Sequence, residues 1–526
     1  MTGNEIQIMI AMLLYMAMVV VLGVTFAKRA NKNSGEFFLG GRSLGPWVTA
    51  MSAEASDMSG WLLMGLPGVA YWCGIADAAW TAIGLAVGTY INWLLVSRRL
   101  RRYSEKAGGA ITLPEYFSNR FKEKNKLILS ISAVFILIFF TVYAASCFVT
   151  CGKLFATLFG MPYVPMMIVG AVFVLIYTLV GGFLAESVSD FMQAIVMISA
   201  LALTLIVATV AAGGPGAVIE NAKDIPGFFE FFGIASPTTD PETGKQLVDA
   251  AGAPLFGEAG SYGFLTILST LAWGLGYFGM PQVLLRFMAI REERELTRSR
   301  RIATVWVFIS LTVAVIIGVV GRKLYPAALA TSSEAESIFI TISTNLFPPL
   351  IAGVVMAGIL AATISSSDSY LLIAASALSK NLYQGVFRRG ASDKTVMTVS
   401  RLTLLLIAVI AVFISLDENS VIFTIVSFAW AGFGATFGPI MLFSLFWKRT
   451  NRAGAIAGMV GGGCMVFFWK LVLRPLGGVL NIYELLPAFL FSSLLIVVVS
   501  LLTAAPEKEI EEEFEEVRAA TPLSFR

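Results

Sequence analysis

Long apolar runs separated by short polar segments recur along the whole chain. Because a helix needs roughly 20 mostly apolar residues to cross a lipid bilayer, each run predicts a membrane-spanning helix. The thirteen predicted spans are 6–27, 45–71, 75–97, 127–158, 163–182, 190–212, 262–288, 302–321, 348–379, 398–415, 420–447, 453–473 and 481–503. Polar residues interrupt the second and the ninth. The pattern therefore predicts an all-α polytopic membrane protein.

Lysine and arginine are divided unevenly between the two sets of alternate loops. With thirteen spans and the N-terminus outside, the inner loops hold about 30 of the 37 lysines and arginines. Since basic residues gather on the cytoplasmic side, we expect the N-terminus outside and the C-terminus inside. The longest outer segment, 213–261, is expected to be a loop with at most short helices. The acidic segment after Glu507 is expected to be a solvated helix or a disordered end.

The composition agrees with a membrane protein and argues against several other classes. Hydrophobic residues make up 57% of the 526 residues and charged residues 13%, whereas soluble domains carry about 25% charged residues. The net charge of +3 gives no basic surface for nucleic acid. The chain has no histidine, which removes the Ser–His triad and the His-ligated zinc site. Without a nucleotide-binding motif, we expect neither an enzyme nor a nucleotide-driven pump, and no cofactor.

Few ionisable residues lie inside the predicted spans, and such residues mark ion or substrate paths by default. Asp57 and Asp368 lie deepest and are interpreted as functional. Asp190 opens the sixth span, where a helix-capping role and a functional role are both open. Arg286 closes the seventh span, and we expect its guanidinium to reach the membrane surface. Glu54 has no physical explanation from the sequence.

Two spans are interrupted by glycine and proline at comparable places. One stretch is SAEASDMSGWLLMGLPG (52–68), and the other is TLAWGLGYFGMP (270–281), five spans later. Both are expected to be helices broken at mid-membrane, where free backbone groups line a binding site. Such a pair is typical of an inverted-repeat transporter. The alternative is that the glycines only permit close helix packing.

A serine-rich cluster in the ninth span supplies a third set of polar groups. Residues 363–369 read TISSSDS, which places hydroxyls around one carboxylate. One or two serines need no function, because a hydroxyl can bond back to its own helix. Oxygen ligands without Cys or His suit a hard cation, and sodium fits this description. Ser365 and Ser369 share a helix face, with Asp368 beside them.

Three segments resemble the sodium:solute symporter family. They are GGRSLGPWVTAMSAEASDMSGWLLMGLPG (40–68), GLGYFGMPQVLLRFMA (274–289) and SFAWAGFGATFGP (427–439). The resemblance covers about 6–503 and implies a leucine-transporter-like core of two inverted repeats with five helices each, the 5+5 arrangement. The implied divisions are 1–35 (first helix and loop), 36–212 (first repeat), 213–261 (outer loop), 262–447 (second repeat), 448–503 (last two spans) and 504–526 (acidic cytoplasmic tail).

The resemblance also implies the residues that bind the coupling ion. The main sodium site would use the carbonyls of Ala55, Met58 and Ala362 and the hydroxyls of Ser365 and Ser366. Asp57 matches the family aspartate on which sodium dependence rests. Asp190, Asp368 and Ser369 resemble a second sodium site that some relatives have.

Within this family the segments look most like the branch that transports proline. The implied substrate pocket consists of Ser59, Gly60, Trp61, Tyr143, Trp273, Tyr277 and Pro281. Aromatic rings suit a pyrrolidine ring and its secondary ammonium. The resemblance thus implies a sodium-coupled importer of L-proline in a prokaryotic cytoplasmic membrane, working as a monomer with sodium, proline and the lipid bilayer as its partners. The alternatives are a symporter for a sugar, sialic acid, pantothenate or a betaine, and a channel or sensor.

Overall fold

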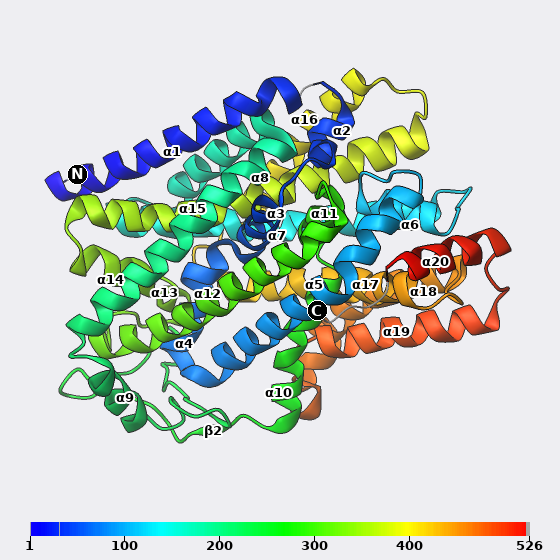
Figure 1. Cartoon of the computed structure of the whole chain (residues 1–526). Coiled ribbons are helices and arrows are strands. Elements are labelled where there is room, and N and C mark those ends of the chain that lie inside the picture. Colours follow the sequence, from blue (N-terminus) through cyan, green and yellow to red (C-terminus); the bar gives the residue numbers. More distant parts are fainter. Residues whose placement is uncertain (1, 31, 522–526) are drawn as a thin grey trace.

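The structure, a computed structural model, describes residues 2–30 and 32–521 and is a bundle of long helices (Figure 1). The longer helices are α1 (Gly3–Ala30), α3 (Pro46–Gly60), α5 (Ile75–Lys106), α7 (Leu127–Phe159), α8 (Tyr163–Ala211), α12 (Leu296–Leu324), α15 (Pro349–Ser376), α16 (Asp393–Ile414), α17 (Ile422–Phe446), α18 (Arg452–Phe468), α19 (Leu485–Leu502) and α20 (Lys508–Ala520). The shorter ones are α2 (Ser34–Leu39), α4 (Leu66–Cys73), α6 (Leu113–Arg120), α9 (Pro215–Asp224), α10 (Phe264–Leu271), α11 (Pro281–Ala289), α13 (Ser332–Ala335) and α14 (Ile338–Leu346).

Turns of 3₁₀ or π geometry extend or join several of these helices. They are Gly40–Arg42, Trp61–Gly65, Ala272–Phe278, Glu293–Glu295, Ala377–Phe387, Trp469–Leu473, Arg474–Leu476 and Gly478–Leu480. Two short strands, β1 (Gly233–Ile234) and β2 (Gly260–Ser261), pair antiparallel. Both lie in the 213–261 segment, which also contains α9 and three isolated strand bridges, Pro237–Phe256, Thr239–Gln246 and Val248–Pro254. The expected loop with short helices therefore also carries strand pairing, which was not predicted.

The predicted membrane spans are all helical, but not all of them are long single helices. Among the described residues, ten helices are long and apolar enough to cross a membrane, and the pair α10–α11, bent by 40°, makes an eleventh. The predicted span 45–71 is divided between α3, the following π turn and α4. The span 163–182 corresponds to a shorter apolar helix, Tyr163–Leu179, at the start of α8. The total of thirteen stays a prediction.

The loop expected between the fifth and sixth spans does not exist. Helix is continuous over Tyr163–Ala211 except at Gly182, where φ is 65° and ψ is 177°. Because glycine tolerates positive φ without steric cost, the axis is interrupted at one residue and no loop is needed. Residues 183–189, predicted as a loop, are therefore helical. The charged residue within them, Glu186, is buried in the bundle.

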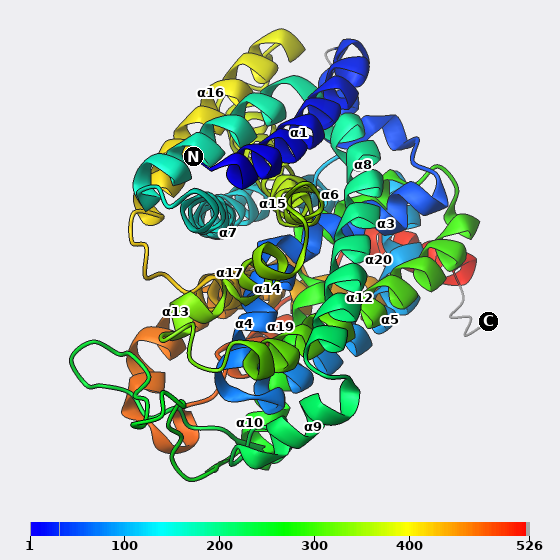
Figure 2. The same cartoon turned by 90° about the vertical axis from the view of Figure 1, so that its left-hand side faces the viewer.

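Helix α15 lies at the centre of the bundle and packs against α1, α3, α7 and α8. All of its residues over 355–376 are buried. A helix that is enclosed on every side must satisfy its polar groups within the protein, because no water is available to them. The view along the helices shows α15 enclosed by its neighbours (Figure 2). The serine-rich cluster of α15 is thus placed in the interior of the bundle.

The two ends of the bundle differ in what they carry. The start of α1 and the helices α9 and α13 lie at one end, and α6 and α20 lie at the other (Figure 1). The start of α1 and the last helix of the chain therefore sit at opposite ends, as an odd number of spans would require.

The acidic C-terminal segment folds as α20 and docks on the bundle with one face. Its buried residues are Ile510, Phe514 and Val517. Lys122 forms ion pairs with Glu509 and Glu513, which raise the pKa of Lys122 above its ordinary value. The expectation of a helix holds, whereas a fully solvated or disordered end does not.

We predict that Phe514→Ala detaches α20 while the rest of the bundle stays intact. Phe514 is 2% exposed, and removing a buried phenylalanine ring costs about 3–5 kcal/mol. Hydrogen exchange followed by mass spectrometry should show faster exchange over 508–520 and unchanged exchange in α19. Glu512→Ala, on the exposed face of the same helix, is the control. Retained protection of α20 in Phe514→Ala would contradict the prediction.

Candidate functional site

The helix α3 is broken at Ser59, in the middle of the second predicted span. Ser59 has φ 50° and ψ −170°, far from helical values. A non-glycine residue with positive φ is strained and persists only where its surroundings hold it. The amide of Trp61 donates a hydrogen bond to the Ser59 hydroxyl over 3.2 Å. The expected break at 52–68 is therefore confirmed.

The break leaves the last carbonyls of α3 without helical partners, as at any helix end. Other groups satisfy them. The carbonyl of Ala55 accepts hydrogen bonds from the hydroxyls of Ser365 (2.9 Å) and Ser366 (3.3 Å) of α15. The Ser365 hydroxyl also lies 3.2 Å from the carbonyl of Ala362. Four of the five residues assigned to the main sodium site thus meet in one buried group of oxygen atoms.

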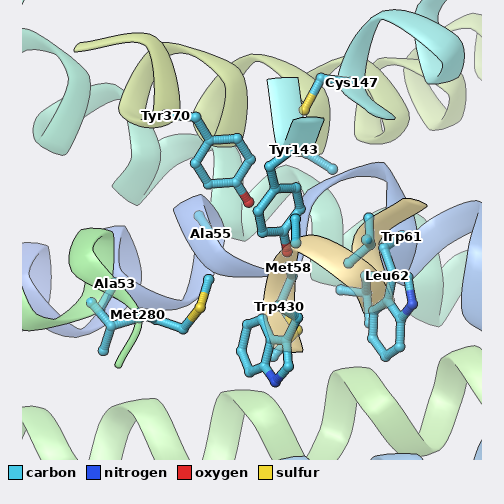
Figure 3. Packing of buried hydrophobic residues seen from close by; sticks show 14 of the residues in the cluster. Ala53, Ala55, Met58, Trp61, Leu62, Tyr143, Cys147, Met280, Tyr370 and Trp430 are labelled. Atoms are coloured by element: carbon cyan, nitrogen blue, oxygen red, sulfur yellow. The ribbon is translucent and has the colours of Figure 1, made fainter. Parts of the chain in front are cut away.

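The fifth residue, Met58, lies one turn beyond Ala55, and its carbonyl accepts a hydrogen bond from the amide of Trp61. The carbonyl of Asp57 is approached by two tyrosine hydroxyls, those of Tyr143 and Tyr370, each at 3.4 Å. Figure 3 shows both rings above the broken segment, and their centroids are 4.2 Å apart. The rings of α7 and α15 therefore cover the break.

The carboxylate of Asp57 meets the second broken span. Its Oδ1 accepts a hydrogen bond from the amide nitrogen of Gln282 in α11 over 3.1 Å. Asp57 therefore links the broken α3 to the second broken span by its side chain, and to α7 and α15 by its backbone.

The second expected break, at 270–281, is also present. Helix α10 ends at Leu271, residues 272–278 form 3₁₀ turns, and α11 begins at Pro281. The amide of Asn92 in α5 holds the carbonyl of Tyr277 at 3.1 Å. The two broken spans meet through their rings, because Trp61 and Trp273 have centroids 5.5 Å apart.

Small residues are required where the broken segments approach their neighbours. A Cβ atom on Gly60 would lie 2.4 Å from the Thr150 side chain, and one on Gly276 would lie 2.0 Å from the indole nitrogen of Trp430. These glycines do permit close packing, as the alternative interpretation held. The same segments are also broken, so both interpretations of the glycines, close helix packing and a break in the helix, are correct.

Three of the predicted substrate residues, Trp61, Trp273 and Tyr277, belong to an aromatic group that also includes two residues of α17 that were not predicted. Trp61 and Trp273 each lie against Phe423 of α17, with centroids 5.7 and 5.4 Å from it. Trp430, also in α17, donates its indole N–H to the carbonyl of Trp273 over 2.8 Å and meets the ring of Tyr277 edge-on. The sequence offered a signal for Trp430, because this residue belongs to the SFAWAGFGATFGP segment that resembles the family.

Arg286 of α11 is fully buried, so the expectation that it reaches the membrane surface is wrong. Its guanidinium pairs with Glu186 and with Asp190, the latter at 3.2 Å. It also donates to the hydroxyls of Ser52 (3.0 Å) and Ser369 (2.9 Å). A buried guanidinium is stable only with such a set of acceptors.

The same cluster corrects the assignment of Asp190. Asp190 lies eight residues beyond the interruption of α8 at Gly182, inside continuous helix, and so does not cap a helix start. Its Oδ2 accepts a hydrogen bond from Ser52 over 2.8 Å, and its Oδ1 has no partner among the described residues. Glu186 was missed because its segment was read as a loop, although Glu186 and Asp190 share one helix face.

Asp368 and Ser369 lie at the edge of this cluster. Oδ1 of Asp368 accepts the amide of Ser369 over 2.8 Å, and Oδ2 has no partner within the described part of the chain. Two buried carboxylates, Glu186 and Asp190, therefore pair with one guanidinium, and a third, Asp368, lies within electrostatic reach of it. Of the residues assigned to a second sodium site, Asp190 and Ser369 contact Arg286, whereas Asp368 acts on its charge from a greater distance.

Glu54 receives a physical explanation from the structure. It is fully buried, and its Oε1 accepts a hydrogen bond from the indole nitrogen of Trp93 in α5 over 3.1 Å. The ring of Trp93 packs edge-on against Phe287 of α11. Glu54 thus fixes α5 against α3 beside the second break.

Two broken helices that meet a buried, hydroxyl-rich helix define a membrane transporter, since such breaks hold ions and solutes at mid-membrane. The family model "Sodium:solute symporter family" matches residues 37–462. The sodium/proline symporter of Haemophilus influenzae is 42% identical over 97% of this chain and 98% of its own, and that of Escherichia coli is 41% identical over 94% and 93%. The chain belongs to the sodium:solute symporter family.

A solved structure shares the fold. The substrate-bound, outward-open structure of a Na⁺-coupled sialic acid symporter aligns with a TM-score of 0.73. The alignment covers 95% of this chain and 99% of that one at 18% identity. It therefore supports the helical arrangement and says nothing of the solute.

We predict that Arg286→Gln lowers the free energy of unfolding by about 3–5 kcal/mol, because it leaves buried carboxylates without their cation. Thermal unfolding in detergent measures the change. Arg291→Gln is the control, because Arg291 pairs with Glu295 at the surface, where an ion pair contributes about 0–1 kcal/mol. Equal unfolding temperatures for the two variants would contradict the prediction.

Proposed function

We propose that this protein imports L-proline together with sodium by alternating access. The observation that carries the proposal is the contact of the Ala55 carbonyl with Ser365 and Ser366. It joins the broken α3 to the central α15 through oxygen atoms alone. The two relatives described above, both sodium/proline symporters, match this chain over nearly its whole length, which supports proline as the solute.

The sodium ion would bind between α3 and α15, held by the carbonyls of Ala55, Met58 and Ala362 and the hydroxyls of Ser365 and Ser366. A hydroxyl that donates to a carbonyl can rotate to present its lone pairs. The same oxygen atoms therefore suit a hard cation, and all of them are neutral, which favours release as well as binding. Asp57 would act on the site through the backbone of its own turn.

Proline would bind beside the ion, on the residues where the two breaks meet. The carboxylate would take backbone amides near Ser59, Gly60 and Trp61. The pyrrolidine ring would lie among Tyr143, Trp273 and Tyr277, with Pro281 at the start of α11. Because Trp61 belongs to the same turn as the ion ligands, sodium binding would order the substrate site, and the coupling is reciprocal.

The coupling ion supplies enough free energy for accumulation. One sodium ion moving through about 100 mV provides roughly 2.3 kcal/mol, which corresponds to a solute gradient of about fifty-fold. Asp190, Asp368 and Ser369 would take a second sodium ion, because Oδ1 of Asp190 and Oδ2 of Asp368 are buried oxygens without a partner among the described residues.

We further propose thirteen spans, with inverted repeats at 36–212 and 262–447. Support comes from the breaks in the first helix of each repeat. The charge distribution of the loops supports an N-terminus outside and a C-terminus inside the cell membrane. Each chain contains its own ion and substrate residues, so it would work as a monomer.

The test of the function is uptake into proteoliposomes that contain the purified protein. Labelled proline should accumulate only with an inward sodium gradient, and Trp273→Ala should abolish the uptake by removing the ring that meets Trp61. A panel with a sugar, sialic acid, pantothenate and a betaine decides between solutes. Accumulation of one of these in place of proline would refute proline as the solute, and sodium current without solute would identify a channel.

A second prediction addresses the ion site. Ser365→Ala removes a hydroxyl that faces Ala55. Because the ion would lose one oxygen ligand, the sodium concentration for half-maximal uptake should rise about tenfold, which corresponds to about 1.4 kcal/mol. Ser367→Ala is the matched control, because the Ser367 hydroxyl bonds to the carbonyl of Thr363 in its own helix over 2.6 Å. An equal sodium dependence in both variants would remove Ser365 from the site.

A further inference from the structure

A polar cavity lies at the end of the bundle that carries α6 and α20 (Figure 1). Its volume is about 460 Å³, within the usual size of small-molecule sites. Three segments line it: the turn at 121–125 before α7, the start of α18 at 451–453, and the segment 503–507 between α19 and α20. The proposed orientation makes this the cytoplasmic end.

The cavity lies at the level where three apolar helices leave the membrane. Each lining segment directly adjoins one predicted span, because 127–158, 453–473 and 481–503 begin or end beside it. Lipid head groups lie at this level, just outside the hydrocarbon core. The side chains of Leu127 and Leu502, at two of these span ends, are 44% and 81% exposed. A ligand in the cavity therefore has exposed apolar side chains next to it.

Hydrogen bonds fix one wall of the cavity. The guanidinium of Arg449 donates to the carbonyls of Thr503 and Ala504 over 2.8 and 3.4 Å. The side-chain amide of Asn451 donates to the Thr503 hydroxyl and to the Ala504 carbonyl, each over 2.7 Å. Asn451 itself is buried. The segment after α19 is therefore held against the start of α18, and the cavity is formed before any ligand binds.

The cavity contains positive charge that has no partner. Lys124 and Arg452 line it, both are exposed, and neither has an ion pair among the described residues. Lys122 lines it too, but it is already paired with two glutamates of α20. Among the described residues that line the cavity, Glu507 is the one acid. Two unpaired cations beside one acid favour a ligand with net negative charge.

We propose that this cavity binds the head group of an anionic phospholipid from the inner leaflet. The phosphate contacts Lys124 and Arg452, and the acyl chains lie along Leu127 and Leu502. Basic pockets between the cytoplasmic ends of spanning helices suit such head groups. A zwitterionic lipid carries its own ammonium group and gains less from two cations. The inference takes the cytoplasmic side from the proposed function and does not depend on the solute.

Binding of phosphatidylglycerol to the purified protein in detergent, measured by native mass spectrometry, tests the site. One lipid per chain should bind tightly and resist competition by phosphatidylcholine. Lys124→Gln combined with Arg452→Gln should weaken this binding about twenty-five-fold, since each basic residue near a lipid phosphate contributes about fivefold. Arg389→Gln combined with Lys394→Gln removes the same charge from exposed residues outside the cavity and should bind as the wild type does.

A second variant separates the cavity from the general charge of the surface. Ala505 lines the cavity and is exposed, so Ala505→Trp fills the space while every cation stays in place. This variant should lose the tightly bound phosphatidylglycerol. Asn419→Trp, which places the same ring in an exposed turn outside the cavity, is the control and should retain it.

Equal affinities of the wild type and the Lys124/Arg452 variant would overturn the site, and so would unchanged binding in Ala505→Trp. Displacement of the lipid by an equal concentration of inorganic phosphate would assign the cavity to a soluble anion and also overturn a lipid site. Binding is measured without transport. Absence of sodium-driven proline uptake would therefore overturn the proposed function and leave the binding result unchanged.

Discussion

The structure depends on how the break in α3 satisfies its backbone. In a membrane no water is available to the carbonyls that lose their helical partners at Ser59, and each unsatisfied group would cost several kcal/mol. Side chains of α15 and α7 supply the missing hydrogen bonds: Ser365 and Ser366 to Ala55, and Tyr143 to Asp57. The serine hydroxyls that stabilise the break are also the ones proposed to bind the ion, so the proposed ion site and the stability of the break share the same atoms.

The buried charges obey the same constraint. Arg286 carries the positive charge of a cluster that would otherwise hold only carboxylates, and it ties α11 to α8 and α15. A guanidinium, two carboxylates and the Ser369 hydroxyl from three helices fix the relative positions of those helices. Any movement of α11 against α8 or α15 has to keep or exchange these contacts. This cluster is therefore a structural link between the two broken spans and the central helix.

The aromatic group joins the two broken spans to α17. Trp61 beside the first break, Trp273 in the second and Phe423 of α17 contact one another, and Trp430 of α17 donates a hydrogen bond to the carbonyl of Trp273. The two breaks are therefore packed against a third helix by large rings. A movement of either broken span has to separate these rings or carry α17 with it.

The sequence by itself determined the helical class, the positions of the two breaks and the serine cluster, because hydropathy and glycine or proline act locally. It also brought Ala55 and Ser365 into one hypothesis through family resemblance. Only the tertiary structure decided what Arg286, Glu54 and the acidic tail contact. The local sequence around a charged residue near a span boundary is the same whether its side chain faces water or a partner on another helix. Glu186 and Arg286 are 100 residues apart, and no local pattern reveals that they meet.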